Sequence, residues 1–430
     1  MAGSIGFGKM TMNDVRFGWD RVLMRVDFNG TTENGTLKST KRIETALPSI
    51  RYALDNGASQ VILMSHNGKT MDIEVSPEKF SLAPAAPYLA EQLGIKADFI
   101  HGFKNPVKSD ARVVLMENTR GDSRDEAEKE DEDKKIAIRM SYAQEIIAAT
   151  NPGIYVLDGF SVSHRDQASV TLPAMLMKQA GKPAVAGNLL YTEYTTFVEK
   201  IINNPQHPFL AFLGGAKVDT KMPMLSALLP NVEGIVVGGA MAFPFMLEKG
   251  MKVEGIDPFS TKDDRQKELS EERERAHLIL SGPNAHKVII PTLVVGPDKN
   301  VIDILKDPIP ANFTMKDIMI TDIAAQLAAA GYKTIFFNGT FGAFEEKLGG
   351  YTAGTYEVFR FMSRETEKRA FTVVGGGDTM DALKGLKKID KSIKFSHETD
   401  GGGASGELLA LGFDGRAHEF PGYKCLSDKQ

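Results

Sequence analysis

Two kinds of residue gather after the short apolar runs of this 430-residue sequence, cations in its first half and glycines in its second. The first-half runs end in four segments with cationic, carboxylate or carboxamide side chains: Arg25–Asn29, Ser65–Lys69, Glu117–Arg120, and Asp158–Phe160 followed by His164–Arg165. Guanidinium groups pair bidentately with carboxylate and phosphate. The first half therefore predicts a binding site for a small, multiply charged anion.

The second-half runs end mostly in glycine. The segments are Gly214–Lys217, Gly238–Gly239, Asn338–Gly339 and Gly375–Thr379. Glycine lets a backbone approach a phosphate chain closely, and the N-terminus of a following helix supplies unpaired N–H groups. This half therefore predicts a nucleotide site.

Taken singly, these features have ordinary structural explanations. Gly375–Thr379 could be a turn with an Asp or Thr helix cap. Lys217 and Lys221 could lie on an exposed helix face, Arg42 on a surface helix, and His66 in a packed core. None of these explanations accounts for cationic and glycine-rich segments sorting in chain order. The arrangement indicates phosphoryl transfer between a nucleotide and an anionic metabolite.

The elements that must position these residues are short strands that alternate with helical periodicity. The predicted strands are Val22–Val26, Val61–Met64, Val113–Met116, Ile154–Leu157, Phe209–Leu213, Gly234–Val237, Val288–Val295, Thr334–Phe337 and Phe371–Val374. Runs of this kind predict buried parallel strands in doubly wound α/β sheets, which bind ligands beyond the carboxyl ends of their strands.

The length favours two or three domains over one core. Residues 187–203 have apolar residues at helical spacing and predict a rigid connecting helix between the halves. The charge-dense segment Arg120–Lys135 predicts a solvated loop and helix face.

Composition excludes several classes. A net charge of −5 argues against a nucleic-acid partner, and no apolar run approaches the length of a membrane span. The single cysteine, Cys425, excludes an internal disulfide and suggests a reducing compartment, so we expect a cytoplasmic protein. Nothing in the sequence demands more than a monomer.

Alternative nucleotide and metal motifs are absent. Gly68–Thr70 ends like a P-loop, but Leu63 stands where that motif requires its first glycine. No GxGxxG follows a strand, and no HExxH or close histidine pair is present.

Over nearly its whole length, in motif order, the sequence resembles the phosphoglycerate kinase family. The matching segments are Arg21–Asn29, Arg42–Ile43, Ser65–Gly68, Glu117–Arg120, Asp158–Phe160, His164–Arg165, Pro208–Val218, Gly238–Phe243, Asn338–Gly339, Gly342–Glu345, Gly375–Thr379 and Gly401–Ser405. The lysine-containing Gly-Gly-Ala-Lys-Val segment and the two glycine triplets are highly specific in combination.

The resemblance implies two Rossmann-like domains joined by a hinge. Residues 1–186, with a returning tail at 407–430, would bind 3-phosphoglycerate or a similar carboxylate. Residues 187–203 would form the hinge helix, and residues 204–406 would bind ATP or ADP with Mg²⁺. The implied reaction is that of glycolysis and gluconeogenesis, in which 1,3-bisphosphoglycerate and ADP give 3-phosphoglycerate and ATP.

The resemblance also implies residue roles. Asp27 and Asn29 would hold the glycerate carboxylate and hydroxyl, and His66, Lys69, Arg120 and Arg165 its phosphate. Arg42 and Lys217, with Gly376 and Gly402, would flank the transferring phosphoryl. The nucleotide would be served by Gly215, Lys221, Gly239, Asn338, Glu345, Gly375, Gly377, Asp378 and Thr379, with Asp378 the metal ligand. A carboxylate acceptor is ionised at neutral pH, so the reaction needs positioning and charge neutralisation but no general base.

Several ligand-facing positions depart from the family pattern. They are Gly30–Thr31, Lys69, Thr192, Ala324–Ala325, Thr340 and Thr399–Asp400. These departures leave three hypotheses open. The chain is a kinase for 3-phosphoglycerate, a paralogue acting on another phosphorylated or phosphonate carboxylate, or a non-catalytic binding relative. The retained Arg42, Lys217 and Asp378 speak against the last.

Overall fold

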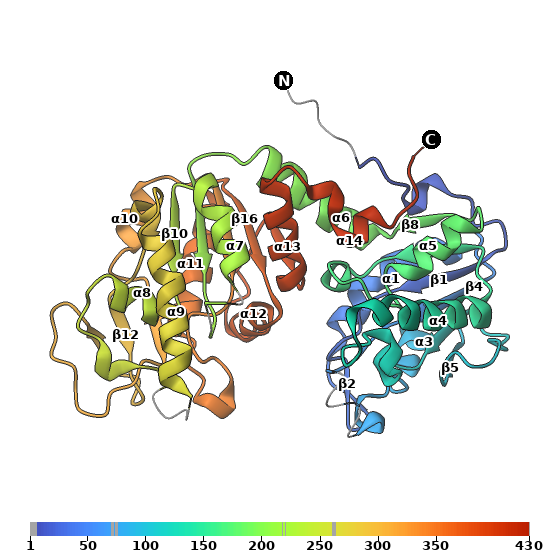
Figure 1. Ribbon diagram of the computed structural model, residues 1–430, viewed down its shortest axis with the longest axis horizontal. Coiled ribbons are helices and arrows are strands. Elements are labelled where there is room, and N and C mark those ends of the chain that lie inside the picture. Colours follow the sequence, from blue (N-terminus) through green and yellow to red (C-terminus); the bar gives the residue numbers. More distant parts are fainter. Residues whose placement is uncertain are drawn as a thin grey trace. The chain divides into compact units, whose positions relative to one another are not determined.

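The computed structural model describes residues 7–69, 73, 76–216, 218–219, 221–259 and 264–429. The chain divides into two compact units, one of residues 1–196 with 418–430 and one of residues 197–417. Each unit is built on a six-stranded sheet whose neighbouring strands are all parallel (Figure 1). The predicted α/β class with two doubly wound sheets is confirmed.

The first unit has the strand order β5-β6-β4-β1-β7-β8. Its strands are β1 (Arg21–Arg25), β4 (Gln60–Met64), β5 (Ala97–Ile100), β6 (Val113–Met116), β7 (Ile154–Leu157) and β8 (Ala184–Ala186), with a small hairpin of β2 (Thr32–Glu33) and β3 (Thr36–Leu37). Alternate strand residues such as Val22 and Met24 pack with Ile43 and Leu89 from the helices of one face, α1 (Lys41–Asp55) and α3 (Ala85–Leu93). The helices α4 (Glu132–Thr150) and α5 (Leu172–Gln179) pack with each other, and α5 also packs against β7 and β8.

The second unit has the order β11-β10-β9-β15-β16-β17. Its strands are β9 (Phe209–Leu213), β10 (Gly234–Val237), β11 (Val288–Ile289), β15 (Thr334–Asn338), β16 (Phe371–Gly375) and β17 (His397–Thr399). Its helices are α7 (Met222–Leu228), α8 (Ala242–Glu248), α9 (Arg265–Leu280), α10 (Ala324–Ala329), α11 (Ala353–Glu367), α12 (Gly377–Ile389) and α13 (Gly402–Phe413). Phe337 and Phe359 belong to the hydrophobic core that lies between the sheet and α10, α11 and α12. Helix α7 packs with α13.

One predicted strand is wrong. Val288–Val295 forms two strands, β11 in the parallel sheet and β12 (Leu293–Val295) in a separate antiparallel sheet with β13 (Val301–Asp303) and β14 (Asp317–Met319). Pro291 lies between them. Because proline has no N–H to donate to a strand ladder, it favours a break at this position.

The connecting helix begins as α6 (Asn188–Thr196) and continues as a π-helical segment, Phe197–Asn203. The division between the units falls at this change of helix type. The chain is predicted to return to the first unit at residue 407, which is too early. Helix α13 packs on α7 within the second unit, and the residues of the first unit resume only at His418. Of the helices described, none is both long and apolar enough to cross a bilayer.

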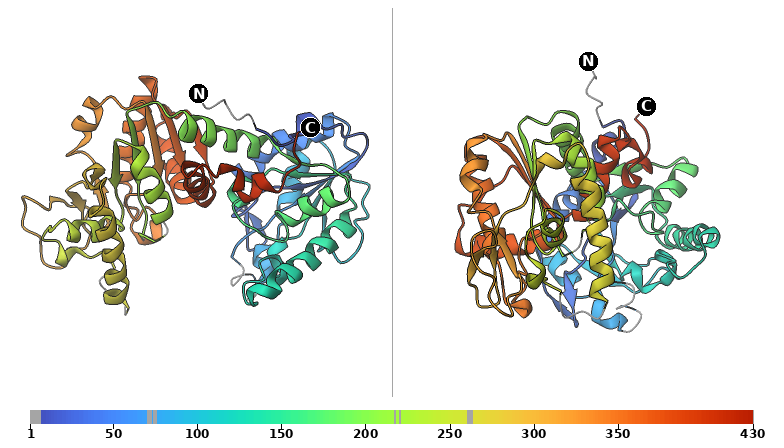
Figure 2. Two further views of the ribbon diagram at one scale, coloured as in Figure 1. Left: turned by 45° about the horizontal axis from the view of Figure 1, so that its top comes forward. Right: turned by 60° about the vertical axis from the view of Figure 1, so that its left-hand side comes forward.

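The final residues complete the first unit. Met10 N–H donates to Ser427 O over 2.8 Å, and Ala186 N–H of β8 donates to Met10 O over 2.9 Å. Figure 2 shows the red C-terminal segment, with α14 (Pro421–Lys424), running along α6. There Tyr423 stacks on Tyr194 with ring centroids 4.5 Å apart.

Candidate active site

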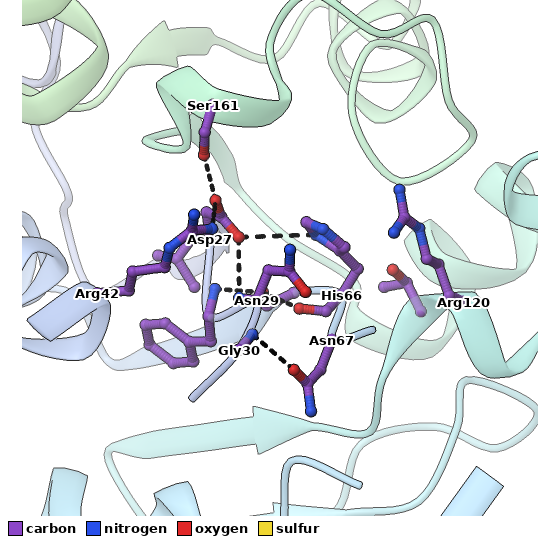
Figure 3. Close-up of polar contacts among 12 residues, drawn as sticks. Asp27, Asn29, Gly30, Arg42, His66, Asn67, Arg120 and Ser161 are labelled. Atoms are coloured by element: carbon purple, nitrogen blue, oxygen red, sulfur yellow. Dashed lines mark hydrogen bonds and ion pairs between the residues drawn. The ribbon is translucent and has the colours of Figure 1, made fainter. Parts of the chain in front are cut away.

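A buried carboxylate, Asp27, lies just beyond the carboxyl end of β1 (Figure 3). It accepts hydrogen bonds from the Arg42 guanidinium of α1, from the Ser161 hydroxyl, and from Asn29 N–H over 2.9 Å. Burial by itself raises the pKa of Asp27, but Arg42 and the hydrogen bonds outweigh it and hold the pKa well below its usual range. Asp27 is therefore ionised and already orients Arg42.

Carboxamide side chains join the three loops that follow β1, β4 and β6. Asn29 Oδ1 accepts from Gly68 N–H and Asn67 Oδ1 from Gly30 N–H, both over 2.8 Å. Asn118 Oδ1 accepts from Asn67 N–H over 3.0 Å. Buried loop backbone needs such partners. Asn29 can offer a ligand both N–H donors of its NH₂ group, while one of the two lone pairs of its oxygen is engaged by Gly68.

The unusual pair Gly30–Thr31 has a local explanation. Gly30 adopts φ +74°, a left-handed conformation that favours glycine. Thr31 is buried, and its hydroxyl donates to Phe28 O over 2.7 Å. The pair therefore forms a closed turn next to Asp27 and Asn29.

His66, beyond β4, is 3% exposed, and its ring faces the Arg25 guanidinium and the Asp27 carboxylate. Its Nδ1 lies 3.3 Å from Arg25 Nη2 and 3.7 Å from Asp27 Oδ1. Burial lowers the pKa of His66 well below its usual value, Arg120, Arg25 and Arg42 lower it further, and Asp27 opposes them. His66 is therefore neutral at neutral pH.

Arg120 and Arg165 meet a carboxylate that the sequence did not reveal as a partner. Arg120 Nη1 donates to Gly68 O over 2.6 Å, and its Nη2 lies 2.7 Å from Glu126 Oε1. Arg165 Nη1 lies 3.7 Å from the same oxygen, to which the Gln167 amide also donates. Arg120, Glu126, Arg165 and Gln167 line a cavity of about 590 Å³ together with Lys69, Glu128, Arg139 and Asp166. The cavity is rich in charge but mixed in sign.

In the second unit, two helix N-termini meet beside a lysine. α12 begins at Gly377 and α13 at Gly402, and a Cβ on Gly402 would lie 2.9 Å from the Gly376 Cα. Lys221 donates to Asn338 Oδ1, at the end of β15. All five residues line a cavity of about 580 Å³, as do Asp378 and Thr379. Unpaired helix N–H groups and a lysine form an anion site of the kind that binds phosphate.

Charges in this cavity depend on burial. Burial lowers the pKa of Lys221 to about 8, although Asp378 partly opposes it. Burial raises the pKa of Asp378, and Glu345 and Asp381 raise it further. A half-buried carboxylate with too little positive charge around it suits a cation, and magnesium commonly binds one or two carboxylates plus substrate phosphates. Asp378 therefore fits the predicted role, although no larger cluster of metal-ligating side chains occurs among the described residues.

Three glycines of the second unit allow close contacts between loops. A Cβ on Gly239 would lie 2.7 Å from Gly215 N, and Cβ atoms on Gly214 and Gly339 would clash with Thr340 O and Gly214 O, respectively. The loops after β9, β10 and β15 therefore pack backbone to backbone. Here glycine serves the contact between loops, whatever it also does for a ligand.

Not every predicted residue lines these cavities. Lys221, Asn338, Gly376, Gly377, Asp378, Thr379 and Gly402 line the cavity of the second unit, whereas Gly215, Gly239, Gly375 and Glu345 are not among its lining residues. Asp400 is also outside the lining, and Lys217 lies outside the described residues. In the first unit, Asp27, Asn29, Arg42 and His66 form one cluster, joined through Gly68 to the cavity of Lys69, Arg120 and Arg165.

The side chains that contact the predicted site residues could not be identified from the sequence. The prediction that Arg120–Lys135 is solvated is wrong at its first turns, because Arg120, Asp125 and Glu126 are buried. Ser161, like Glu126, gave no signal because its role depends on a contact far away in the sequence. Arg25 was visible in the cationic motif, but its burial behind His66 was not.

Comparison with known proteins identifies a family. The family model described as Phosphoglycerate kinase matches residues 12–411. Phosphoglycerate kinase of Thermosipho africanus is 35% identical over 98% of both chains, and that of Lactobacillus johnsonii is 34% identical over 98% of this chain and all of the other. Phosphoglycerate kinase structures from Coxiella burnetii and Pyrococcus horikoshii superpose with TM-scores of 0.70 and 0.77, at 27% and 23% identity, over 97% of this chain and 98% and 100% of theirs.

Proposed function

Because the chain belongs to the phosphoglycerate kinase family, we propose that it transfers a phosphoryl group between ATP or ADP and the carboxylate of 3-phosphoglycerate. Magnesium would accompany the nucleotide. The first unit would bind the acceptor, the second the nucleotide, and residues 187–203 would act as the hinge. The reaction would belong to glycolysis and gluconeogenesis. The enzyme would be a monomer in the cytoplasm.

The observation that carries this proposal is the meeting of the α12 and α13 N-termini beside Lys221. Backbone N–H groups in the first turns of α12 and α13, from Gly377 and Gly403 onward, supply fixed partial charge without reorganisation, which suits the oxygens of a phosphoryl group in transfer. A bound magnesium ion would add charge neutralisation, with Asp378 as its protein ligand.

The acceptor needs orientation rather than activation. A carboxylate is already a nucleophile at neutral pH, so the ionised Asp27 is not required as its base. Asp27 instead holds the Arg42 guanidinium, which is 22% exposed and so retains donors for the substrate. Arg42, together with Lys217, is proposed to stabilise the phosphoryl group during transfer.

A paralogous activity on another phosphorylated or phosphonate carboxylate is the second candidate. Its support is the mixed charge of the acceptor cavity, where Glu126 already engages Arg120 and a lysine, Lys69, replaces an arginine. A lysine makes a point contact instead of a bidentate one and selects phosphate geometry less strictly.

A coupled assay of ADP formation distinguishes the candidates. The purified chain is given Mg-ATP with 3-phosphoglycerate, glycerate, or phosphonate and other phosphorylated carboxylates. The main proposal expects the highest kcat/KM with 3-phosphoglycerate. A higher value with another acid would favour the paralogue, and no turnover with any acid despite nucleotide binding would favour the non-catalytic relative.

A variant sharpens this choice. If 3-phosphoglycerate is the natural acceptor, Lys69→Arg should lower its KM, because a bidentate contact replaces a point contact. The KM for glycerate, which has no phosphate, serves as the control and should stay unchanged. A rise in the 3-phosphoglycerate KM would contradict the assignment of Lys69 to the phosphate.

A further inference from the structure

Arg25 is a fully buried arginine directly behind the acceptor cluster. It is the last residue of β1, and its side chain has no exposed surface. Its Nη1 donates to Val26 O over 2.8 Å and to Met64 O over 3.4 Å. These two carbonyl groups fix the plane of the guanidinium. They aim its Nη2 at His66 Nδ1, 3.3 Å away.

The chemistry of this contact allows one assignment of the proton. A guanidinium group has five N–H donors, no acceptor, and a pKa too high to lose a proton in a protein. The nitrogen opposite it must therefore be an acceptor. His66 Nδ1 thus has no hydrogen, and in the neutral ring the hydrogen belongs to Nε2.

The surrounding charges point the same way. The ionisable groups that face His66 are Arg25 of β1, Arg42 of α1, Arg120 after β6, and the carboxylate Asp27 after β1. Three cations and burial disfavour an imidazolium ion. The one carboxylate, 3.7 Å from Nδ1, is already held by Arg42 and two further donors. His66 Nε2 has no hydrogen-bond partner in the described part of the chain, so its N–H is available.

We propose that Arg25 is a positioning residue that holds His66 as the neutral tautomer with its hydrogen on Nε2, so that the ring gives the acceptor substrate an N–H donor and no positive charge. This inference rests on the proposed function only for the identity of the substrate. The resemblance alone implied that His66 holds the phosphate. The positive charge at this end of the site comes instead from Arg42, Arg120, Arg165 and Lys69.

Nitrogen-15 NMR of the full chain tests the tautomer without any turnover. Long-range correlations from the ring protons distinguish protonated from unprotonated ring nitrogens. His66→Gln identifies the His66 signals among the eight histidines. We expect protonated Nε2 and unprotonated Nδ1 from pH 6 to pH 8. An imidazolium ion at pH 7, or hydrogen on Nδ1, would overturn the proposal, whereas lack of turnover with 3-phosphoglycerate would not.

Variants at position 25 test the cause. Arg25→Met removes the donor and one neighbouring cation, so the hydrogen should move to Nδ1, facing Asp27, or the ring should become charged. Arg25→Lys keeps a cationic donor and should restore the wild-type signals. Arg112→Met is the matched control, because Arg112 also donates to main-chain carbonyls, those of Leu54 and Ala58, but lies at the opposite ends of the strands. Unchanged His66 signals in Arg25→Met would overturn the assignment.

Kinetics give a second readout. If the hydrogen moves to Nδ1 in Arg25→Met, loss of one neutral hydrogen bond from Nε2 should raise the acceptor KM roughly three- to tenfold, with the ATP KM within twofold of wild type. A charged ring would keep that donor and should not raise the acceptor KM. Should Arg25→Met fail to fold, the wild-type tautomer and the His66 signals of Arg25→Lys still decide whether Arg25 controls the His66 ring. A lysine variant that folds and has an imidazolium His66 at pH 7 would show that the buried cation does not control the ring.

Discussion

Asp27 and Asp158 follow neighbouring strands, β1 and β7, and both are buried, yet their carboxyl groups differ in protonation. Arg42 and several hydrogen bonds keep Asp27 ionised. Asp158 accepts from Leu189 N–H over 2.9 Å at the start of α6, but its Oδ2 has no partner. Burial raises the pKa of Asp158 to about 7, with Ser49 and main-chain N–H groups opposing. A partner cation therefore decides which buried carboxylate stays charged.

The first prediction concerns Asp158→Asn. The folded-state pKa of about 7 lies above the unfolded value of about 3.9, so this group contributes stability at low pH that is lost as pH rises through 7. From pH 5.5 to pH 8.5, wild type should lose about 2 kcal/mol of unfolding free energy relative to the variant. Urea unfolding of both proteins at the two pH values measures this. A difference that does not change with pH would contradict the raised pKa.

Glu126 supplies the second prediction. Its carboxylate neutralises Arg120 and Arg165, so Glu126→Gln should leave their charge uncompensated. We expect inorganic phosphate to bind about fivefold more tightly at low salt, by calorimetry, as an effect of about 1 kcal/mol.

Glu128→Gln is the matched control, because Glu128 lines the same cavity from an exposed position and no ion pair joins it to Arg120 or Arg165 among the described residues. Weaker phosphate binding in Glu126→Gln would instead mean that Glu126 is needed to orient the arginines.

At the scale of elements, the sequence predicted the central strands well and the sheet edges poorly. The inner strands are continuous apolar runs, which a parallel sheet covered on both faces requires. The edge strands β5 and β17 are short and only partly buried, and β11 has two residues. Such segments have too few apolar residues to stand out from loops.

The α12 N-terminus gives the third prediction. Gly376 adopts φ +103°, where a side chain is strained, and its Cα lies against Gly402. Gly376→Ala should therefore distort the cradle and weaken ATP binding about tenfold, since strain of 1–2 kcal/mol is typical for such positions.

The shift of the melting temperature with Mg-ATP measures the effect, because ligand that binds only the folded state stabilises it in proportion to its affinity. Gly255→Ala, where a Cβ meets open space, is the control in the same unit. An unchanged ATP-induced shift in Gly376→Ala would show that nucleotide does not bind at this turn.

For the whole molecule, the two-unit division could be predicted from the sorting of motifs, but the point of return could not. α13 contains Ala404, Leu408 and Leu409, whose burial against the second unit looks in sequence like any apolar helix. The final segment is short, and its contacts with the first unit depend on residues more than 200 positions away, such as Tyr194. Only tertiary structure reveals such a return.

The C-terminal return also supports the acceptor cluster, which gives the last prediction. Phe420 is fully buried against Phe160 and Tyr194, with ring centroids 6.1 and 6.2 Å apart. Gly422 N–H donates to Ser163 O over 2.6 Å. These contacts hold the turn Phe160–Val162, from which Ser161 reaches Asp27. The end of the chain therefore helps to position the site that begins at β1.

Phe420→Ala should destabilise the first unit by about 3–5 kcal/mol, the usual cost of truncating a buried phenylalanine. Hydrogen exchange measured by mass spectrometry should show faster exchange in β1, β7 and the Phe160–Val162 turn, with the strands of the second unit unchanged. Acceptor affinity should fall while the ATP-induced thermal shift is kept. Ile389→Ala, at a position 73% exposed in the second unit, is the control and should change neither. Equal loss of protection in both units would mean that they unfold as one, and that the terminal segment does not act on the acceptor site alone.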